Sequence, residues 1–148
     1  MAGETAQRLR ARPLMLIDAT FNVITGQILE AAIEVHRTLG PGLLESTYMP
    51  CLQYELTARK LRFANQRTVP IVYKGIPLDT SYRIDLVVED VVIVEVKSVA
   101  VLLAVHQAQV LTYLRLTACP AALLINFNVP KLIDGVKRLL NPRVVKRS

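Results

Sequence analysis

The fold is decided by YRIDLVVEDVVIVEVK at residues 82–97, where two runs of aliphatic and β-branched residues flank an acidic turn at Glu89 and Asp90. Such runs are typical of strands, and their alternating side chains allow the hairpin register to be predicted. One apolar face is formed by Ile84, Leu86 and Val88, and the other by Val92, Val94 and Val96. Matching these faces pairs 84 with 96, 86 with 94 and 88 with 92. This register requires an odd connection, 89–91, or a bulge, and it places Asp85 opposite Glu95.

The polar residues of this hairpin need a chemical explanation, because Asp85, Glu95 and Lys97 each lie in an otherwise apolar strand. Two converging carboxylates repel each other unless a cation lies between them, and their oxygen atoms suit a hard ion such as Mg²⁺ or Mn²⁺. Lys97 shares a strand face with Glu95 and can orient or activate a water, while the Val96 carbonyl can add an oxygen ligand. The alternative is a surface with ordinary ion pairs, Glu95 with Lys97 or Asp85 with Arg83, and spacing alone favours this alternative.

Two helical patterns precede the hairpin. Apolar residues recur at three- and four-residue steps over 22–39, which predicts an amphipathic helix that ends at the GPG of 40–42. A second helical pattern over 43–61 contains Pro50, so we expect a kink or a break near 46–50. Alternation at 69–73 then predicts a strand, with a turn at Lys74-Gly75.

The residues after the hairpin predict three further elements: a helix over 103–116, a buried strand over 121–127 and a short final helix over 131–140. The order of elements is that of an α/β fold. We expect the 121–127 strand to lie parallel to the 91–97 strand through a crossover helix.

Composition limits the class of protein. The chain has 148 residues, of which 52% are hydrophobic, enough for one domain with a sizeable core. Its longest uninterrupted apolar run, 99–105, is too short for a membrane span, and the N-terminus is a poor signal peptide. Cys51 and Cys119 predict neither a disulfide framework nor a zinc site. We therefore expect a cytoplasmic protein.

The net charge of +6 suggests an anionic partner such as nucleic acid, but the charge lies at the ends of the chain. Residues 18–130 carry nine basic and ten acidic side chains. We divide the chain into a basic N-terminal extension, 1–17, a single domain, 18–142, and a basic tail, 143–148, for which solubility is the simpler explanation.

Six segments of the chain occur in a recognisable order. They are HRTLGPGLLESTY at 36–48, YKG at 73–75, YRIDLVVED at 82–90, IVEVK at 93–97, HQAQVLTYLRLT at 106–117 and LLINFNV at 123–129. This set resembles the GxxExxY protein family, a branch of the PD-(D/E)XK nuclease-like superfamily, whose signature corresponds to GLLESTY at 42–48. The resemblance spans roughly 22–142, and the ordered set is far more specific than the signature alone.

The resemblance implies a restriction-endonuclease-like αβββαβ core with an additional N-terminal helix and a short C-terminal helix. It also implies roles for five side chains. Asp85 and Glu95 would be the principal metal ligands, Glu45 an outer ligand or water-orienting carboxylate, and Lys97 the water-activating cation. Gln109 would position water or a phosphate. Pro50 departs from the family pattern, two residues after the signature tyrosine.

We therefore expect a metal-dependent nuclease that uses Mg²⁺ or Mn²⁺ to hydrolyse phosphodiester bonds of DNA or RNA. The alternatives are a non-catalytic nucleic-acid-binding or assembly module that retains the fold, and a homo-oligomeric structural component. Two side chains also have two interpretations. Tyr48 either packs in the core, which we favour, or supports Glu45, and His36 either has a structural role, which we favour, or contacts phosphate.

Overall fold

The computed structural model describes the backbone of residues 14–143 and the side chains of residues 22–143. Most of the predicted N-terminal extension and all of the predicted tail except Arg143 lie outside these residues. No helix in the described part of the chain is long and apolar enough to cross a membrane.

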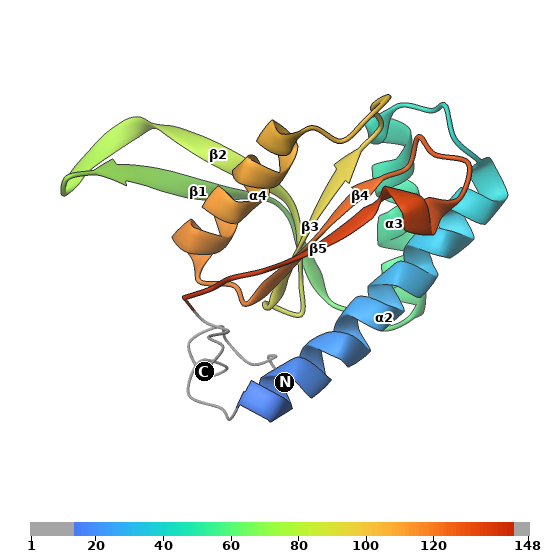
Figure 1. Ribbon diagram of the computed structural model, residues 1–148, viewed down its shortest axis with the longest axis horizontal. Coiled ribbons are helices and arrows are strands. Elements are labelled where there is room, and N and C mark those ends of the chain that lie inside the picture. The colour runs from blue at the N-terminus through green and yellow to red at the C-terminus, as the bar shows by residue number, and fades with distance from the viewer. Residues whose placement is uncertain (1–13, 144–148) are drawn as a thin grey trace.

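A five-stranded sheet forms the centre of the domain (Figure 1). Its strands, in spatial and chain order, are β1 (Phe63–Tyr73), β2 (Ile76–Val88), β3 (Val92–Lys97), β4 (Ala121–Asn126) and β5 (Val136–Leu140). β3 and β4 are parallel and are connected through helix α4 (Ala104–Thr117), while the other neighbours are antiparallel. The predicted crossover and the αβββαβ order are therefore confirmed.

Helices cover both faces of this sheet. Helices α2 (Leu14–Leu39) and α3 (Glu45–Ala58) pack on one face, in a cluster that contains Leu86, Val88 and Val94. Helix α4 packs on the other face with Val87 and Ile93. The period-two alternation of β2 and β3 thus divides the core into two layers.

The predicted hairpin register is confirmed where β2 pairs with β3. Leu86 pairs with Val94 and Val88 with Val92, and the connection is Glu89-Asp90-Val91, whose first two residues have positive φ. Ile84 is an exception, because it packs in the α4 cluster rather than beside Leu86. The described pairing also stops at Leu86, so 84 does not pair with 96.

The part of β2 that precedes Leu86 pairs only with β1, and the two strands form an arm that projects from the sheet (Figure 1). The predicted turn at Lys74-Gly75 joins the two strands, and both turn residues have positive φ, 48° and 79°. This backbone twist matches that of the flanking strands, which is why the two-residue turn is favoured. The arm has no helix on its far end and leaves Tyr73 and Ile76 about 60% exposed (59% and 61%).

Helix α3 is continuous through Pro50, so of the two outcomes expected near 46–50, a kink or a break, the break is wrong. Pro50 lacks the N–H that would bond to the carbonyl of Ser46. Ser46 is exposed, so water can satisfy this carbonyl without interrupting the helix.

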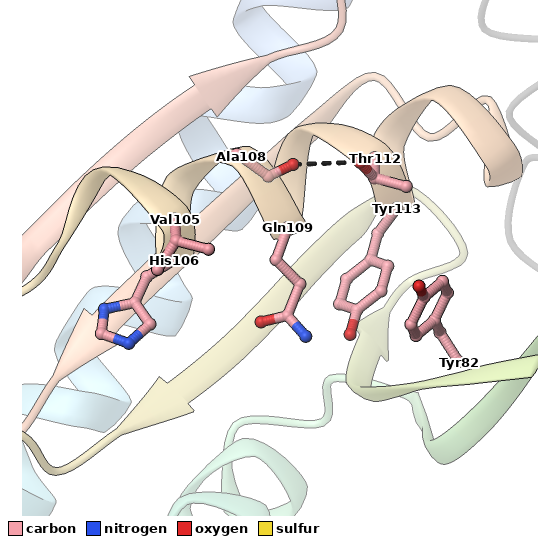
Figure 2. A pocket seen from close by; sticks show the side chains of 7 residues that line it. All are labelled: Tyr82, Val105, His106, Ala108, Gln109, Thr112 and Tyr113. Atoms are coloured by element: carbon pink, nitrogen blue, oxygen red, sulfur yellow. Dashed lines mark hydrogen bonds between the residues drawn. The ribbon is translucent and has the colours of Figure 1, made fainter.

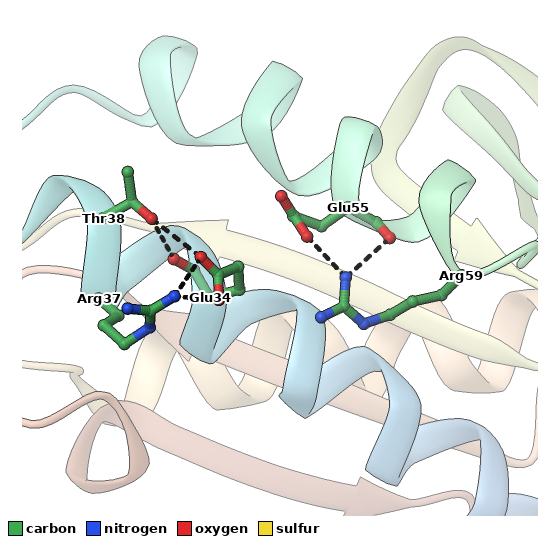
Figure 3. A network of polar contacts seen from close by, with 5 residues as sticks. All are labelled: Glu34, Arg37, Thr38, Glu55 and Arg59. Atoms are coloured by element: carbon green, nitrogen blue, oxygen red, sulfur yellow. Dashed lines mark hydrogen bonds and ion pairs between the residues drawn. The ribbon is translucent and has the colours of Figure 1, made fainter.

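Helices α2 and α3 each carry a local ion pair (Figure 3). Arg37 lies 2.6 Å from Glu34, and Arg59 lies 2.6 Å from Glu55. The hydrogen bond from Arg37 lowers the pKa of Glu34. Ion pairs in contact with water contribute little to stability. The packing of these helices on the sheet therefore depends mainly on the buried apolar residues between them.

The predicted C-terminal helix over 131–140 is present only as one 3₁₀ turn, η1 (Leu132–Gly135), and the remainder is strand β5. β5 pairs with β4 from Ala121 opposite Leu140 to Ile125 opposite Val136. The side chains of β5 alternate between the two layers of the core, with Val136 on the α2 and α3 side and Leu139 on the α4 side. Pairing satisfies the backbone groups of the completely buried β4, which a helix here would leave unpaired.

Candidate functional site

Asp85 and Glu95 meet where β2 and β3 part. Glu95 Oε1 accepts a hydrogen bond from the Asp85 N–H at 2.9 Å, and Asp85 Oδ2 accepts one from the Val96 N–H at 3.0 Å. The two carboxylates thus replace the backbone ladder that would otherwise continue past Leu86. Each carboxylate uses one oxygen in this exchange and has a second oxygen for another partner.

The electrostatics of this pair are unfavourable. Glu95 is only 4% exposed, and burial, followed by the nearby charge of Asp85, raises its pKa to about 8. Burial is also the largest cause of the raised pKa of Asp85. A buried carboxylate beside a half-buried one favours either a proton or a cation between them, as expected of a site built for a positive charge.

Lys97 and Val96 complete the β3 side of the site. The positive charge of Lys97, two residues beyond Glu95 on β3, partly offsets the upward pKa shifts of Asp85 and Glu95. The N–H of Val96 points to Asp85, and the N–H and C=O of one strand residue face the same neighbour. The Val96 carbonyl therefore faces the β2 side of β3, where the carboxylates lie.

Glu45 is the first residue of α3 and approaches the end of β3. Its Oε2 accepts a hydrogen bond from the Ser98 N–H at 3.3 Å, and the Ser98 hydroxyl donates to the carbonyl of Leu43. The loop before Glu45 turns through Gly40 and Gly42, with φ of 73° and 94°, a region that glycine adopts without strain. This loop and the residue after Lys97 therefore hold each other in place.

Tyr48 both fills the core and supports this loop. Its side chain is completely buried and stacks on Phe127, with ring centroids 4.5 Å apart. Its hydroxyl donates to the Gly40 carbonyl at 2.6 Å and accepts from the Leu43 N–H at 3.1 Å. Tyr48 thus acts on Glu45 through the loop backbone, which combines the two interpretations given above.

Replacing Tyr48 with phenylalanine should separate these two roles. The ring would still stack on Phe127, but Gly40 and Leu43 would lose their shared partner, which should lower the free energy of unfolding by about 1–2 kcal/mol. Urea denaturation measures this loss. A Tyr54→Phe variant on the same helix is the control, because Tyr54 is 72% exposed and should tolerate the change. Equal stability of Tyr48→Phe and wild type would contradict the proposed pinning of the loop.

Gln109 and Tyr113 present side chains from one face of α4 (Figure 2). Tyr113 is 3% exposed, and burial, together with the charges of Glu95 and Asp85, raises its pKa to about 12. The Gln109 amide opposes this shift, so it lies beside the Tyr113 hydroxyl. Gln109 and Tyr113 therefore line one pocket together, and Gln109 remains a predicted site residue.

The two histidines have structural partners. His36 is buried, and its Nε2 lies 2.7 Å from the Val129 carbonyl, which connects α2 to the segment after β4. His106 Nδ1 accepts a hydrogen bond from the Leu103 N–H at 2.9 Å and caps the start of α4. The structural interpretation favoured for His36 agrees with this contact.

Ser98 and Asn126 are supporting residues that sequence reasoning missed. Asn126 is 2% exposed, accepts from the Val99 N–H at 3.0 Å and donates to the Val99 carbonyl at 2.9 Å. It therefore fixes the course of the chain just beyond Lys97. The sequence offered two signals for them. Ser98 is a polar residue directly after the lysine, and Asn126 is an asparagine at the end of an apolar strand.

The donor set fits a hard cation in part. Within the described residues, no three His, Cys, Asp or Glu side chains lie close enough together to hold a metal ion. The carboxylates of Asp85 and Glu95 and the carbonyl of Val96 nevertheless provide oxygen atoms on one side of β3. Two carboxylates with further positions left for water and substrate are typical of Mg²⁺, which retains several waters in proteins.

The site thus consists of a carboxylate pair and a lysine where two central strands of a mixed α/β sheet part. A family model described as the PD-(D/E)XK nuclease superfamily matches residues 22–139. Because this match covers most of the chain, the protein belongs to the PD-(D/E)XK nuclease superfamily. Searches of curated proteins and of solved structures gave no match.

Proposed function

We propose that this protein is a metal-dependent nuclease that hydrolyses phosphodiester bonds of nucleic acid. The proposal rests on one observation above all: Asp85 and Glu95 exchange hydrogen bonds across two central strands and are forced to share a poorly solvated space beside Lys97. Such an arrangement costs stability in the absence of a cation, so a functional reason for it is expected. Membership of the nuclease superfamily supports the same reaction class.

Within the superfamily, we assign the chain to the GxxExxY family. The signature residues all act on the same loop before α3, which supports the assignment. Gly42 allows the turn before α3, Glu45 contacts Ser98 beyond the end of β3, and Tyr48 holds the intervening loop. The signature therefore describes one structural unit that holds the Glu45 carboxylate against the residue that follows β3.

Each residue of the site has a proposed role in this reaction. Asp85, Glu95 and the Val96 carbonyl would hold Mg²⁺ or Mn²⁺, with Glu45 as an outer carboxylate. When bound, such an ion supplies charge that polarises the phosphate and lowers the pKa of water. Lys97 then stabilises the negative charge that develops on the phosphate, and Gln109 orients water or a phosphate oxygen. Glu45 holds its position through the Ser98 N–H.

The partner that suits this chemistry is nucleic acid. The projecting arm carries exposed Arg67, Lys74 and Arg83 against a single acidic residue, Asp79, between positions 64 and 84. A surplus of exposed cations attracts the phosphate backbone without reading its sequence. The arm can therefore contribute to substrate binding next to the carboxylate site.

Cleavage of single- and double-stranded DNA and RNA by purified protein tests the proposal. We expect cleavage with Mg²⁺ or Mn²⁺, none with a chelator, and a loss of at least about 100-fold in Asp85→Asn, because a direct ligand should matter at least as much as a supporting residue. Asp79→Asn is the matched control, since it makes the same change at an exposed position of the same strand. Cleavage unaffected by Asp85→Asn would refute the proposal. Binding without cleavage would indicate the non-catalytic module instead.

A further inference from the structure

A pocket of about 320 Å³ opens between α4 and the base of the β1–β2 arm (Figure 2). It is lined by Tyr82, Val105, His106, Ala108, Gln109, Thr112 and Tyr113. All but one of these residues come from α4, and Tyr82 comes from β2. The pocket therefore lies where a rigid helix faces a strand that also supplies Asp85.

The two tyrosines give the pocket an aromatic end. Their ring centroids lie 6.0 Å apart with an interplanar angle of 54°. Tyr113 is 3% exposed, whereas Tyr82 is 47% exposed and faces Tyr113 across the end of the pocket (Figure 2). A half-exposed ring held against a buried one offers a flat, pre-positioned surface to a planar ligand, with little conformational entropy to lose.

The polar groups of the pocket complement this aromatic surface. The Gln109 side chain projects from α4 alongside Tyr113 and ends in an amide that both donates and accepts hydrogen bonds (Figure 2). Tyr113 also packs in one buried cluster with Ile84, the residue directly before Asp85 on β2, so the pocket adjoins the strand segment that supplies Asp85. A flat ligand with hydrogen-bonding edges, attached to a phosphate near the carboxylates, fits both features.

We propose that this pocket binds one unpaired nucleobase of the substrate, stacked on Tyr82 with an edge directed to Gln109. The inference rests on the proposed action on nucleic acid and specifies it further. A base inside a duplex is already stacked on both sides and paired at its edge, so it cannot enter. The substrate is therefore a single strand or a locally unpaired nucleotide, with the adjoining phosphate directed to Asp85 and Glu95.

The test uses a short single-stranded oligonucleotide that carries 5-iodouridine, with Ca²⁺ in place of the activating ion, and the same sequence as a blunt duplex. Light couples 5-iodouridine to an aromatic ring stacked against it, and mass spectrometry locates the coupled residue. We expect coupling to Tyr82 and tighter binding of the single strand. Tyr82→Ala should raise the Kd by about 5- to 150-fold, the range for loss of one base–aromatic stack.

Two variants serve as controls. Tyr82→Phe keeps the ring and should retain binding, and Tyr73→Ala removes a somewhat more exposed tyrosine of the same arm that does not line the pocket. Equal effects of Tyr82→Ala and Tyr73→Ala, coupling at another residue, or equally tight duplex binding would overturn the inference.

If the protein cleaves nucleic acid but never couples through Tyr82, only this inference fails. If it couples through Tyr82 but never cleaves, the proposed function fails and the pocket remains a binding site. If neither the oligonucleotide nor the duplex binds and no nucleic acid is cleaved, both fail.

Discussion

The Glu95→Gln variant should lose nuclease activity and yet, without metal, be more stable than the wild-type protein at pH 8 and above. The carboxyl of Glu95 has a pKa of about 8 in the folded protein, against an ordinary value of 4.5. Between these values the folded state keeps a proton that the unfolded state releases. The free energy of unfolding of the metal-free wild type therefore falls as pH rises through this window, whereas glutamine removes this titration.

The size of this effect follows from the width of the window. One pKa unit corresponds to about 1.4 kcal/mol, so the fall in the free energy of unfolding should amount to several kcal/mol across it. Glutamine is a suitable replacement because its side-chain oxygen can still accept the hydrogen bond from the Asp85 N–H. Urea denaturation in chelator, at pH values on both sides of the window, measures the two slopes.

The titration of Glu95 also predicts how metal binding should change the stability of the protein. A cation bound between Asp85 and Glu95 should stabilise wild type at pH 8 by mass action and have much less effect on Glu95→Gln. Glu30→Gln, an exposed change on α2, should follow wild type throughout. Parallel pH slopes for wild type and Glu95→Gln would contradict the unfavourable burial on which the metal proposal rests.

The part of the site on β2 and β3 could be predicted because it depends on local rules. Side chains alternate along a strand, and the odd connection after Val88 follows from matching apolar faces, so Asp85 and Glu95 had to meet if the hairpin formed. Their raised pKa values could not be predicted in the same way. Those depend on how completely the folded chain excludes water from the pair.

Elements that depend on distant partners were harder to predict. The residues from Leu132 to Leu140 have helical spacing, but the free edge of β4 requires hydrogen bonds, and pairing with that edge determines the structure. Ile84 was assigned to the face of Leu86, but the arm departs from the sheet at Asp85 and carries Ile84 into the other layer. Both errors arise because tertiary pairing overrides a local pattern.

The pocket beside the site had no sequence signal. Tyr82 lies in the predicted strand and Tyr113 in the predicted α4 helix, thirty-one positions away, and nothing local indicates that their rings lie 6.0 Å apart. Gln109 came from the family resemblance alone. Its position beside Tyr113 gives that assignment a physical basis, because an amide at the mouth of an aromatic pocket can select a ligand edge.

Gly135→Ala should be the most destabilising small substitution among the glycines described, although it adds a single methyl group. A Cβ atom at Gly135 would lie 2.2 Å from the backbone oxygen of Asn126 and 3.0 Å from Val129 Cγ2. The first contact is with backbone, so η1 would have to move away from the end of β4. We expect a loss of about 3 kcal/mol in the free energy of unfolding, the upper end of the usual range for overpacking.

The consequences should extend to the site, because Asn126 holds Val99 just beyond Lys97. Displacing the Asn126 backbone should therefore lower nuclease activity by more than the loss of folded protein explains, measured per folded molecule. Gly26→Ala is the matched control: a Cβ there meets nothing within 4 Å, and the residue lies inside α2. Alanine should stabilise that helix by about 0.5–1 kcal/mol, so the same substitution should have opposite signs at the two glycines. A Gly135→Ala variant as stable as wild type would show that the end of β4 and η1 can separate freely, and that Asn126 does not transmit their packing to the site.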